Sequence, residues 1–138
     1  MENSKNTLSI LDLDETLIHC TPFEFENDFD FKIDKNRCRI RTGLTEFITK
    51  IAEHFELAIW SSAPDEYVQK ISTIIKPNNI EFRFIWGKSK CSINEESNDL
   101  YSTGYDDTNS IKDLRLVNSE FAYSLDNILI IDDTPQKA

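Results

Sequence analysis

The sequence lacks the long apolar runs that a membrane helix requires. No run in its 138 residues approaches the roughly 20 apolar positions that cross a bilayer. The amino-terminal stretch MENSKNTLS also lacks the basic and apolar regions of a signal peptide. We therefore expect a protein that does not associate with membranes.

An excess of positive charge is also absent. The chain has 15 Lys and Arg against 25 Asp and Glu, and its formal net charge is −10. Because affinity for nucleic acids depends largely on neutralising phosphates, this balance disfavours general nucleic-acid binding. It is compatible with a small anionic substrate, since a site can be locally cationic.

Cysteine is scarce, and it forms no Cys-x-x-Cys or Cys/His pattern of the kind that binds zinc. The cysteines, Cys20, Cys38 and Cys91, are odd in number and widely spaced. This usage favours free thiols in a reducing cytoplasm over a disulfide scaffold. We expect a cytoplasmic protein, or a nuclear one if the source is eukaryotic.

The sequence has the composition and patterning of one folded domain over residues 1–138. Apolar residues make up 39% and charged residues 29%, and no repeat or low-complexity tract interrupts them. The predicted core strands are LSILDLD, ELAIW, EFRFIW and NILIID. They alternate with amphipathic helices over residues 44–55 and in PDEYVQKISTII, which Pro77 ends. This alternation predicts an α/β fold with a mainly parallel sheet.

Three further segments complete the predicted organisation. FDFKI and CRIRT alternate with period two and predict a hairpin over about residues 29–42. Residues 88–110 are acidic, rich in Ser and Asn, and weakly periodic, which indicates an exposed excursion. IKDLRLV, directly after it, predicts a short helix.

Oxygen-bearing side chains follow three of the predicted strands. They are Asp12 and Asp14, then Ser61 and Ser62, and finally Asp132, Asp133 and Thr134. Ligands bind beyond the carboxyl ends of parallel strands, and carboxylates that converge there need a cation. Hard oxygen ligands in small number suit Mg²⁺.

Two simpler interpretations of the first acidic pair compete with a metal site. Aspartate is common where strands end, because its side chain bonds to nearby backbone, and a turn would explain Asp12 and Asp14 alone. The second acidic pair, after another strand, favours the metal. An EF-hand fails on spacing, because Leu17 and Phe23 stand where that loop requires Gly and Glu.

Four stretches in order carry a family resemblance: ILDLDETLIH, ELAIWSSA, IKDL and ILIIDDTPQKA. They resemble the motifs of the FCP/SCP-like, or NLI-interacting-factor-like, phosphatases of the haloacid dehalogenase (HAD) superfamily, from about Leu8 to the last residue. The resemblance implies a HAD-type, Rossmann-like parallel sheet with a small β-hairpin flap and no large cap domain. Relatives continue through another helix and strand, so the resemblance also implies that the C-terminal part of the family fold lies beyond the given sequence, an expectation about the fold only.

The resemblance assigns a role to each candidate residue of the first two motifs. Asp12 would be the nucleophile that forms an aspartyl-phosphate, and Asp14 the general acid and then the general base. Thr16 would hold Asp14 in place, or else cap the following segment. Ser61, with Ser62 beside it, would bind the phosphoryl oxygens; alternatively, either serine caps the helix at Pro64.

The later motifs supply a cation and the remaining metal ligands. Lys112 would offset charge on the phosphoryl group, although its position alone indicates a solvated surface residue. The resemblance makes Asp133 a direct Mg²⁺ ligand and Asp132 a partner of Lys112, and which of the two contacts the metal is left open. Asp12 and the main-chain carbonyl of Asp14 complete the predicted metal set.

The remaining candidate side chains have structural interpretations. His19 follows the first motif and His54 lies at the polar margin of a predicted helix, and we expect both to be structural. Trp60 and Trp86 end apolar strands, which favours a place in the core over a substrate platform.

The sequence therefore predicts a Mg²⁺-dependent phosphomonoesterase that acts through an aspartyl-phosphate. A site without a lid accepts bulky substrates, so phosphoserine or phosphothreonine in a protein or peptide is the preferred substrate. A small phosphorylated metabolite and a nucleic-acid end are the alternatives, as is a non-catalytic binding or scaffold relative. The oligomeric state is open.

Overall fold

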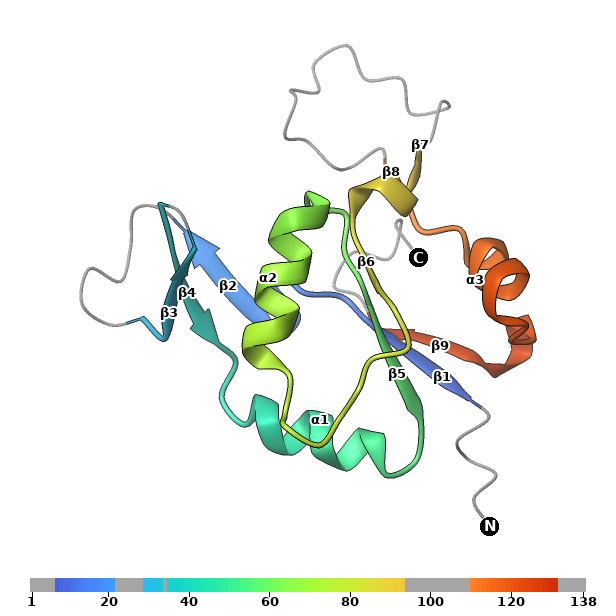
Figure 1. Ribbon diagram of the computed structural model, residues 1–138, viewed down its shortest axis with the longest axis horizontal. Coiled ribbons are helices and arrows are strands. Elements are labelled where there is room, and N and C mark those ends of the chain that lie inside the picture. The colour runs from blue at the N-terminus through green and yellow to red at the C-terminus, as the bar shows by residue number, and fades with distance from the viewer. Residues whose placement is uncertain (1–6, 22–28, 34, 94–109, 132–138) are drawn as a thin grey trace.

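The centre of the fold is a parallel sheet. The computed structural model describes residues 7–21, 29–33, 35–93 and 110–131. Its main sheet has four parallel strands in the order β6-β5-β1-β9, and Figure 1 shows β1 between β5 and β9. The strands are β1 (Leu8–Leu11), β5 (Glu56–Trp60), β6 (Ile85–Trp86) and β9 (Ile128–Ile131). The predicted α/β class with a parallel sheet is confirmed.

Alternating side chains along the strands build an apolar layer on each face of this sheet. Leu57 and Ile59 of β5 face the layer that contains α1 (Leu44–Ala52) and α2 (Asp65–Ile75). Ala58 and Trp60 of the same strand face the layer that contains α3 (Leu114–Phe121). Because both faces are covered, β1 and β5 read as continuous apolar runs.

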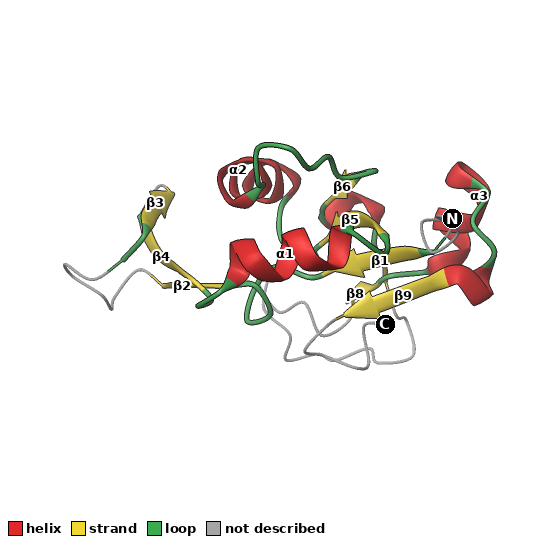
Figure 2. Cartoon of the chain, turned by 90° about the horizontal axis from the view of Figure 1, so that it is seen from below, coloured by secondary structure: helices red, strands yellow, loops and turns green. Residues whose placement is uncertain are grey.

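The predicted hairpin forms part of a second, antiparallel sheet. Its strands are β3 (Phe31–Ile33) and β4 (Asn36–Ile40), which confirms the pairing of these segments. A further strand, β2 (Ile18–Thr21), pairs with the other edge of β4 and was not predicted. We call β2, β4 and β3 the flap sheet. Figures 1 and 2 show it at one end of the long axis and α3 at the other.

The expectation that the cysteines are free thiols is wrong for two of them. Cys20 and Cys38 form a disulfide across β2 and β4. The two residues are register partners, and their Cα atoms lie 4.1 Å apart. The strand pairing brings together residues 18 apart in sequence, which cysteine spacing does not reveal. Cysteine usage therefore gives no support to a reducing compartment, although Cys91 lies outside the disulfide.

Several predicted boundaries shift when tertiary contacts are present. Helix α1 ends at Ala52, so His54 lies in a turn rather than in the helix predicted to reach residue 55. EFRFIW contributes only the short strand β6, because only Ile85 and Trp86 pair with β5. Pro64 is the N-cap of α2 rather than its first residue.

The predicted excursion over residues 88–110 is ordered where it begins and ends. Strand β7 (Ser92–Ile93) pairs antiparallel with β8 (Ser110–Ile111). Residues 94–109 between them lie outside the described residues. The short helix predicted in IKDLRLV exists as α3, three residues after the segment begins. None of the described helices combines the length and apolar character needed to cross a bilayer.

Candidate active site

The candidate site lies at the carboxyl edge of the parallel sheet. Asp12 directly follows β1, and its N–H donates to the Ile131 carbonyl at 3.0 Å, which extends the sheet hydrogen bonding by one residue. Ser61 directly follows β5, and its N–H donates to the Trp86 carbonyl at 2.9 Å. Leu11 of β1 is in register with Ile59 of β5. The first two motifs therefore end at the same edge.

Lys112 lies against Asp12, 100 residues away in sequence. The Lys112 ammonium donates to Asp12 Oδ1 at 3.1 Å, and the two residues are only 2% and 7% exposed. This burial excludes the interpretation of Lys112 as a solvated surface residue. A charge so far from water depends on its partner, because loss of one member leaves the other uncompensated. The Lys112 ammonium is therefore a fixed cation beside Asp12, the candidate nucleophile.

The turn after Asp12 packs one side chain inward and leaves its neighbour accessible. Leu13 is fully buried, and its carbonyl accepts from the N–H groups of Leu17 and Ile18 at 2.8 and 3.1 Å. Asp14 is half-buried. Glu15 has a φ of 66°, a conformation that only a minority of non-glycine residues adopt. Strand β1 itself ends at Leu11, so Asp12 and Asp14 belong to the turn rather than to the strand.

Thr16 contacts Asp12 rather than Asp14. Its hydroxyl donates to Asp12 Oδ2 at 3.3 Å. The hydroxyl is thus directed back along the chain, and a role of Thr16 in holding Asp14 stays a prediction. Asp12 thus has Lys112 on one carboxylate oxygen and Thr16 on the other.

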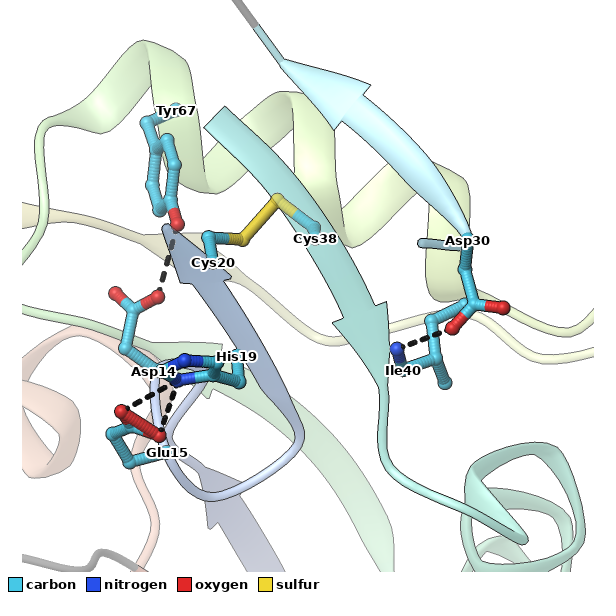
Figure 3. Close-up of a disulfide and its surroundings, with 8 residues drawn as sticks. All are labelled: Asp14, Glu15, His19, Cys20, Asp30, Cys38, Ile40 and Tyr67. Carbon is cyan, nitrogen blue, oxygen red and sulfur yellow. Dashed lines mark hydrogen bonds and ion pairs between the residues drawn. A yellow bond between two sulfur atoms is a disulfide. The ribbon is translucent and has the colours of Figure 1, made fainter. Parts of the chain in front are cut away.

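Asp14 is held by a residue that the sequence did not indicate. The hydroxyl of Tyr67, on α2, donates to Asp14 Oδ1 at 2.9 Å, as Figure 3 shows. Burial and the adjacent Asp14 charge both raise the pKa of Tyr67, so its phenol remains a donor at neutral pH. The pair is 53 residues apart, and one Tyr on an amphipathic helix carries no signal for this contact.

Ser61 and Ser62 occupy the loop between β5 and α2, and both are buried. The Ser61 hydroxyl accepts from the Ala63 N–H at 3.1 Å. Neither serine is the cap of α2, because Pro64 is the N-cap and has no side-chain capping bond. The loop, rather than a helix cap, sets the position of these hydroxyls.

Two of the predicted metal ligands cannot be placed. Asp132 and Asp133 lie outside the described residues, as does the predicted contact of Asp132 with Lys112. Within the described ranges, no group of three or more His, Cys, Asp or Glu side chains is arranged to hold a metal ion. In the described part of the chain, the Asp12 carboxylate and the Asp14 main-chain carbonyl are oxygens of the kind that suits Mg²⁺.

The other candidate side chains have structural positions. Trp60 is fully buried and Trp86 nearly so, with ring centroids 4.9 Å apart, which confirms their place in the core. His19 Nδ1 lies 2.8 Å from a Glu15 carboxylate oxygen, at the base of the flap sheet. His54 is exposed in the turn after α1.

One family model matches nearly the whole chain. Residues 7–138 match the model of the NLI interacting factor-like phosphatases. The chain therefore belongs to the NLI interacting factor-like phosphatase family, as the motifs predicted.

Two relatives cover most of the chain. CTD small phosphatase-like protein 2 of Dictyostelium discoideum is 30% identical over 98% of this chain and 22% of its own length. CTD small phosphatase-like protein 3 of Caenorhabditis elegans is 32% identical over 89% of this chain and 46% of its own length. The chain thus spans less than half the length of either relative.

A solved structure confirms the fold. The fission yeast RNA polymerase II CTD phosphatase Fcp1-R271A, bound to beryllium fluoride, matches with a TM-score of 0.55 and 22% identity. The match covers 94% of this chain and 38% of that one. The HAD-type fold predicted from the motifs is therefore confirmed.

Proposed function

We propose that the protein is a Mg²⁺-dependent phosphomonoesterase that acts through an aspartyl-phosphate on Asp12. The observation that carries the proposal is the Asp12 carboxylate, fixed between Lys112 and Thr16 at the carboxyl edge of the sheet. A buried carboxylate with one firm cation is oriented for attack, and family membership supports this chemistry.

Asp14 supplies the proton that the reaction needs. Asp12 attacks phosphorus, the bond from phosphorus to the substrate oxygen breaks, and Asp14 protonates the departing alkoxide. A water molecule then attacks the aspartyl-phosphate, Asp14 accepts its proton, and Asp12 is regenerated as phosphate leaves. Tyr67 keeps the Asp14 carboxyl in place through both steps.

Ser61, Ser62 and Lys112 bind the phosphoryl oxygens in this proposal. The serines lie buried at the end of β5, and Lys112 neutralises developing charge in a site with little water. Asp12, the Asp14 carbonyl and Asp133 would hold Mg²⁺, with Asp132 beside them. The metal would neutralise phosphoryl oxygens when bound.

The proposed substrate is phosphoserine or phosphothreonine in a protein. The names of the relatives, both CTD small phosphatase-like proteins, support a phosphoprotein. The motifs leave no room for a large cap domain, which favours a bulky substrate over a small metabolite. A cytoplasmic or nuclear location stays a prediction, as does the single-domain organisation.

Leaving-group dependence tests the proposal directly. Asp12→Asn cannot form the acyl-phosphate and should be inert toward every phosphomonoester. Asp14→Asn keeps the nucleophile and loses the proton donor, a change that typically costs about 10²–10⁴-fold. Its deficit should shrink for p-nitrophenyl phosphate compared with an alkyl phosphate, because nitrophenolate needs little protonation. The measurement is kcat/KM for both substrates, with and without Mg²⁺.

Each outcome of these turnover measurements supports or contradicts a stated part of the proposal. No turnover of p-nitrophenyl phosphate by the parent protein with Mg²⁺ would refute the enzyme and favour a binding relative. A deficit in Asp14→Asn that is equal for both substrates would remove Asp14 from the role of general acid. A phosphopeptide panel then distinguishes a protein substrate from a small metabolite.

A further inference from the structure

The flap sheet has two faces of opposite character. Side chains alternate between faces along a strand. Ile18, Ile33 and Ile40 face the hydrophobic core that contains α1 and α2. The residues between them therefore face away from the core, and on β4 these are arginines. We define the cationic flap face by Lys32, Arg37, Arg39 and Arg41, with His19 at its edge.

Strand register brings these cations together. Lys32 of β3 is the partner of Arg37 on β4, and Arg39 is the partner of His19 on β2. Arg41 follows β4 two residues after Arg39. Lys32, Arg39 and Arg41 are exposed, and Arg37 is half-buried with its guanidinium 5.9 Å from the centroid of the Phe29 ring. Residues 29–42 hold five of the chain's 15 Lys and Arg, in a protein of net charge −10.

Two acidic side chains among the described residues lie near this face, and both are engaged. Asp30 Oδ2 accepts from the Ile40 N–H at 2.7 Å, and Glu15 contacts His19. Within the described residues, no ion pair joins Lys32, Arg37 or Arg41 to a carboxylate. Like charges that face each other across strands are destabilising. An anionic partner would relieve this repulsion, so the face has a reason to bind one.

The cationic flap face begins beside the candidate active site. A hollow of about 310 Å³ is lined by Glu15, His19, Arg39 and Arg41, among others. Glu15 directly follows Asp14, and Figure 3 shows Glu15 and His19 at the base of the flap sheet. The hollow that Arg39 and Arg41 line therefore adjoins the turn that carries Asp14, which suits a substrate chain that continues from a phosphate at Asp12 toward the arginines.

We propose that the cationic flap face binds a run of acidic side chains that flanks the target phosphoserine or phosphothreonine of a protein substrate. This inference rests on the proposed function and adds the substrate's sequence context. A short acidic segment matches a patch only a few residues wide. A nucleic acid would extend past it and meet the repulsion of an otherwise acidic protein.

Paired peptides and a charge-matched variant test the inference. One phosphoserine peptide carries a flanking run of Glu, and its twin carries Gln at the same positions. Lys32→Gln/Arg41→Gln removes two exposed charges from the cationic flap face. Lys50→Gln/Lys70→Gln, with exposed lysines on α1 and α2, removes the same charge elsewhere. We measure kcat/KM for both peptides and for p-nitrophenyl phosphate.

The parent protein should prefer the Glu peptide. The flap variant should lose about three- to tenfold in kcat/KM on that peptide, since exposed pairs are individually weak. Its activity on the Gln peptide and on p-nitrophenyl phosphate should stay within about twofold, and the control should match the parent throughout. Raising the ionic strength should erase the preference, because screening shortens the reach of charges to about 8 Å at 0.15 M.

Failure of this inference is distinguishable from failure of the proposed function. Equal losses on the Glu and Gln peptides, or no preference in the parent, would overturn the docking role while leaving the phosphatase intact. If no substrate is turned over, fluorescence anisotropy of a labelled, unphosphorylated Glu-rich peptide still decides the docking role. The parent should bind it more tightly than the flap variant does, and equal affinities would overturn the inference. A single-stranded oligonucleotide that binds more tightly than this peptide would assign the face to nucleic acid instead.

Discussion

The carboxyl edge of the parallel sheet and the flap sheet use charge in opposite ways. At the sheet edge, Asp12 and Lys112 are almost fully buried and contact each other directly. On the flap sheet, Lys32 and Arg41 are exposed, and no described carboxylate pairs with them. Burial makes the first arrangement specific and costly to disturb, whereas exposure makes the second adaptable and weak. We therefore propose that the chemistry takes place at the first and that the second selects the substrate.

The largest effect expected from breaking this contrast is that of Lys112→Ala. Loss of one electrostatic donor at a reacting centre typically costs about 10²–10³ in rate. Because Lys112 is buried, the change also leaves the Asp12 carboxylate without its cation, at a cost of about 3–5 kcal/mol in the free energy of unfolding.

Steady-state turnover of p-nitrophenyl phosphate and urea unfolding measure the two consequences of Lys112→Ala. Lys90→Ala is the matched control, since Lys90 makes an exposed 4.0 Å ion pair with Glu120. That control should change the free energy of unfolding by under about 1 kcal/mol and leave turnover unchanged. Equal effects of the two substitutions would show that burial does not distinguish the sheet edge from the surface.

The second prediction concerns the link within the flap sheet. Replacing Cys20 and Cys38 with Ala removes a cross-link between residues 18 apart, which should lower the free energy of unfolding by about 2–4 kcal/mol. Turnover of p-nitrophenyl phosphate should change by less than about twofold, because Asp12 follows β1 and Lys112 follows β8, and neither residue lies on the flap sheet. Urea unfolding with and without dithiothreitol measures the first effect.

Cys91→Ala is the control for this pair, since Cys91 takes no part in the disulfide. Dithiothreitol should destabilise the parent and Cys91→Ala and leave the double variant unchanged. A double variant as inactive as Asp12→Asn would mean that the flap sheet, rather than the parallel sheet, positions the nucleophile.

The sequence was most informative where local pattern and motif agreed. The apolar runs of β1, β5 and β9 and the period-two hairpin predicted their strands. Motif order placed Lys112 at the site despite its unremarkable surroundings. The third flap strand, the Cys20–Cys38 disulfide and the Tyr67 contact all depend on pairing between distant segments. Because no local period encodes such pairing, these features required three-dimensional structure.

The third prediction concerns the contact between Tyr67 and Asp14, which lies between the edge of the parallel sheet and the flap sheet. Tyr67→Phe keeps the ring and removes the hydroxyl that donates to Asp14 at 2.9 Å. Hydrogen bonds to charged groups contribute about 1.5–3 kcal/mol, so loss of part of this positioning should cost about tenfold in kcat for an alkyl phosphate. The loss should be smaller for p-nitrophenyl phosphate, which needs little help from Asp14.

The leaving-group series separates positioning from shape for Tyr67. In the Asp14→Asn background, adding Tyr67→Phe should have little further effect, since the group that Tyr67 orients has lost its function. A uniform loss across leaving groups, or full additivity of the two substitutions, would assign Tyr67 to packing alone. Urea unfolding of Tyr67→Phe checks that the fold is retained.

The smallest prediction asks whether exposure, rather than proximity to the site, sets the size of an effect. Asp65 begins α2, close in sequence to Ser61, but it is exposed and accepts from the Ser89 N–H at 3.0 Å. Hydrogen bonds from Ser89 hold the pKa of Asp65 below its ordinary 3.8. A lowered folded pKa stabilises the protein above the unfolded pKa, and this contribution disappears as the pH falls through the folded value.

Asp65→Asn should therefore lower the free energy of unfolding by under about 1 kcal/mol at pH 6, and by progressively less below pH 3.8. Urea unfolding at several pH values measures the effect of Asp65→Asn. Glu66→Gln removes the same charge from the same turn without a bond to Ser89, and at pH 6 it should lower the free energy of unfolding by less. A cost for Asp65→Asn as large as that for Lys112→Ala would mean that place in the fold outweighs burial.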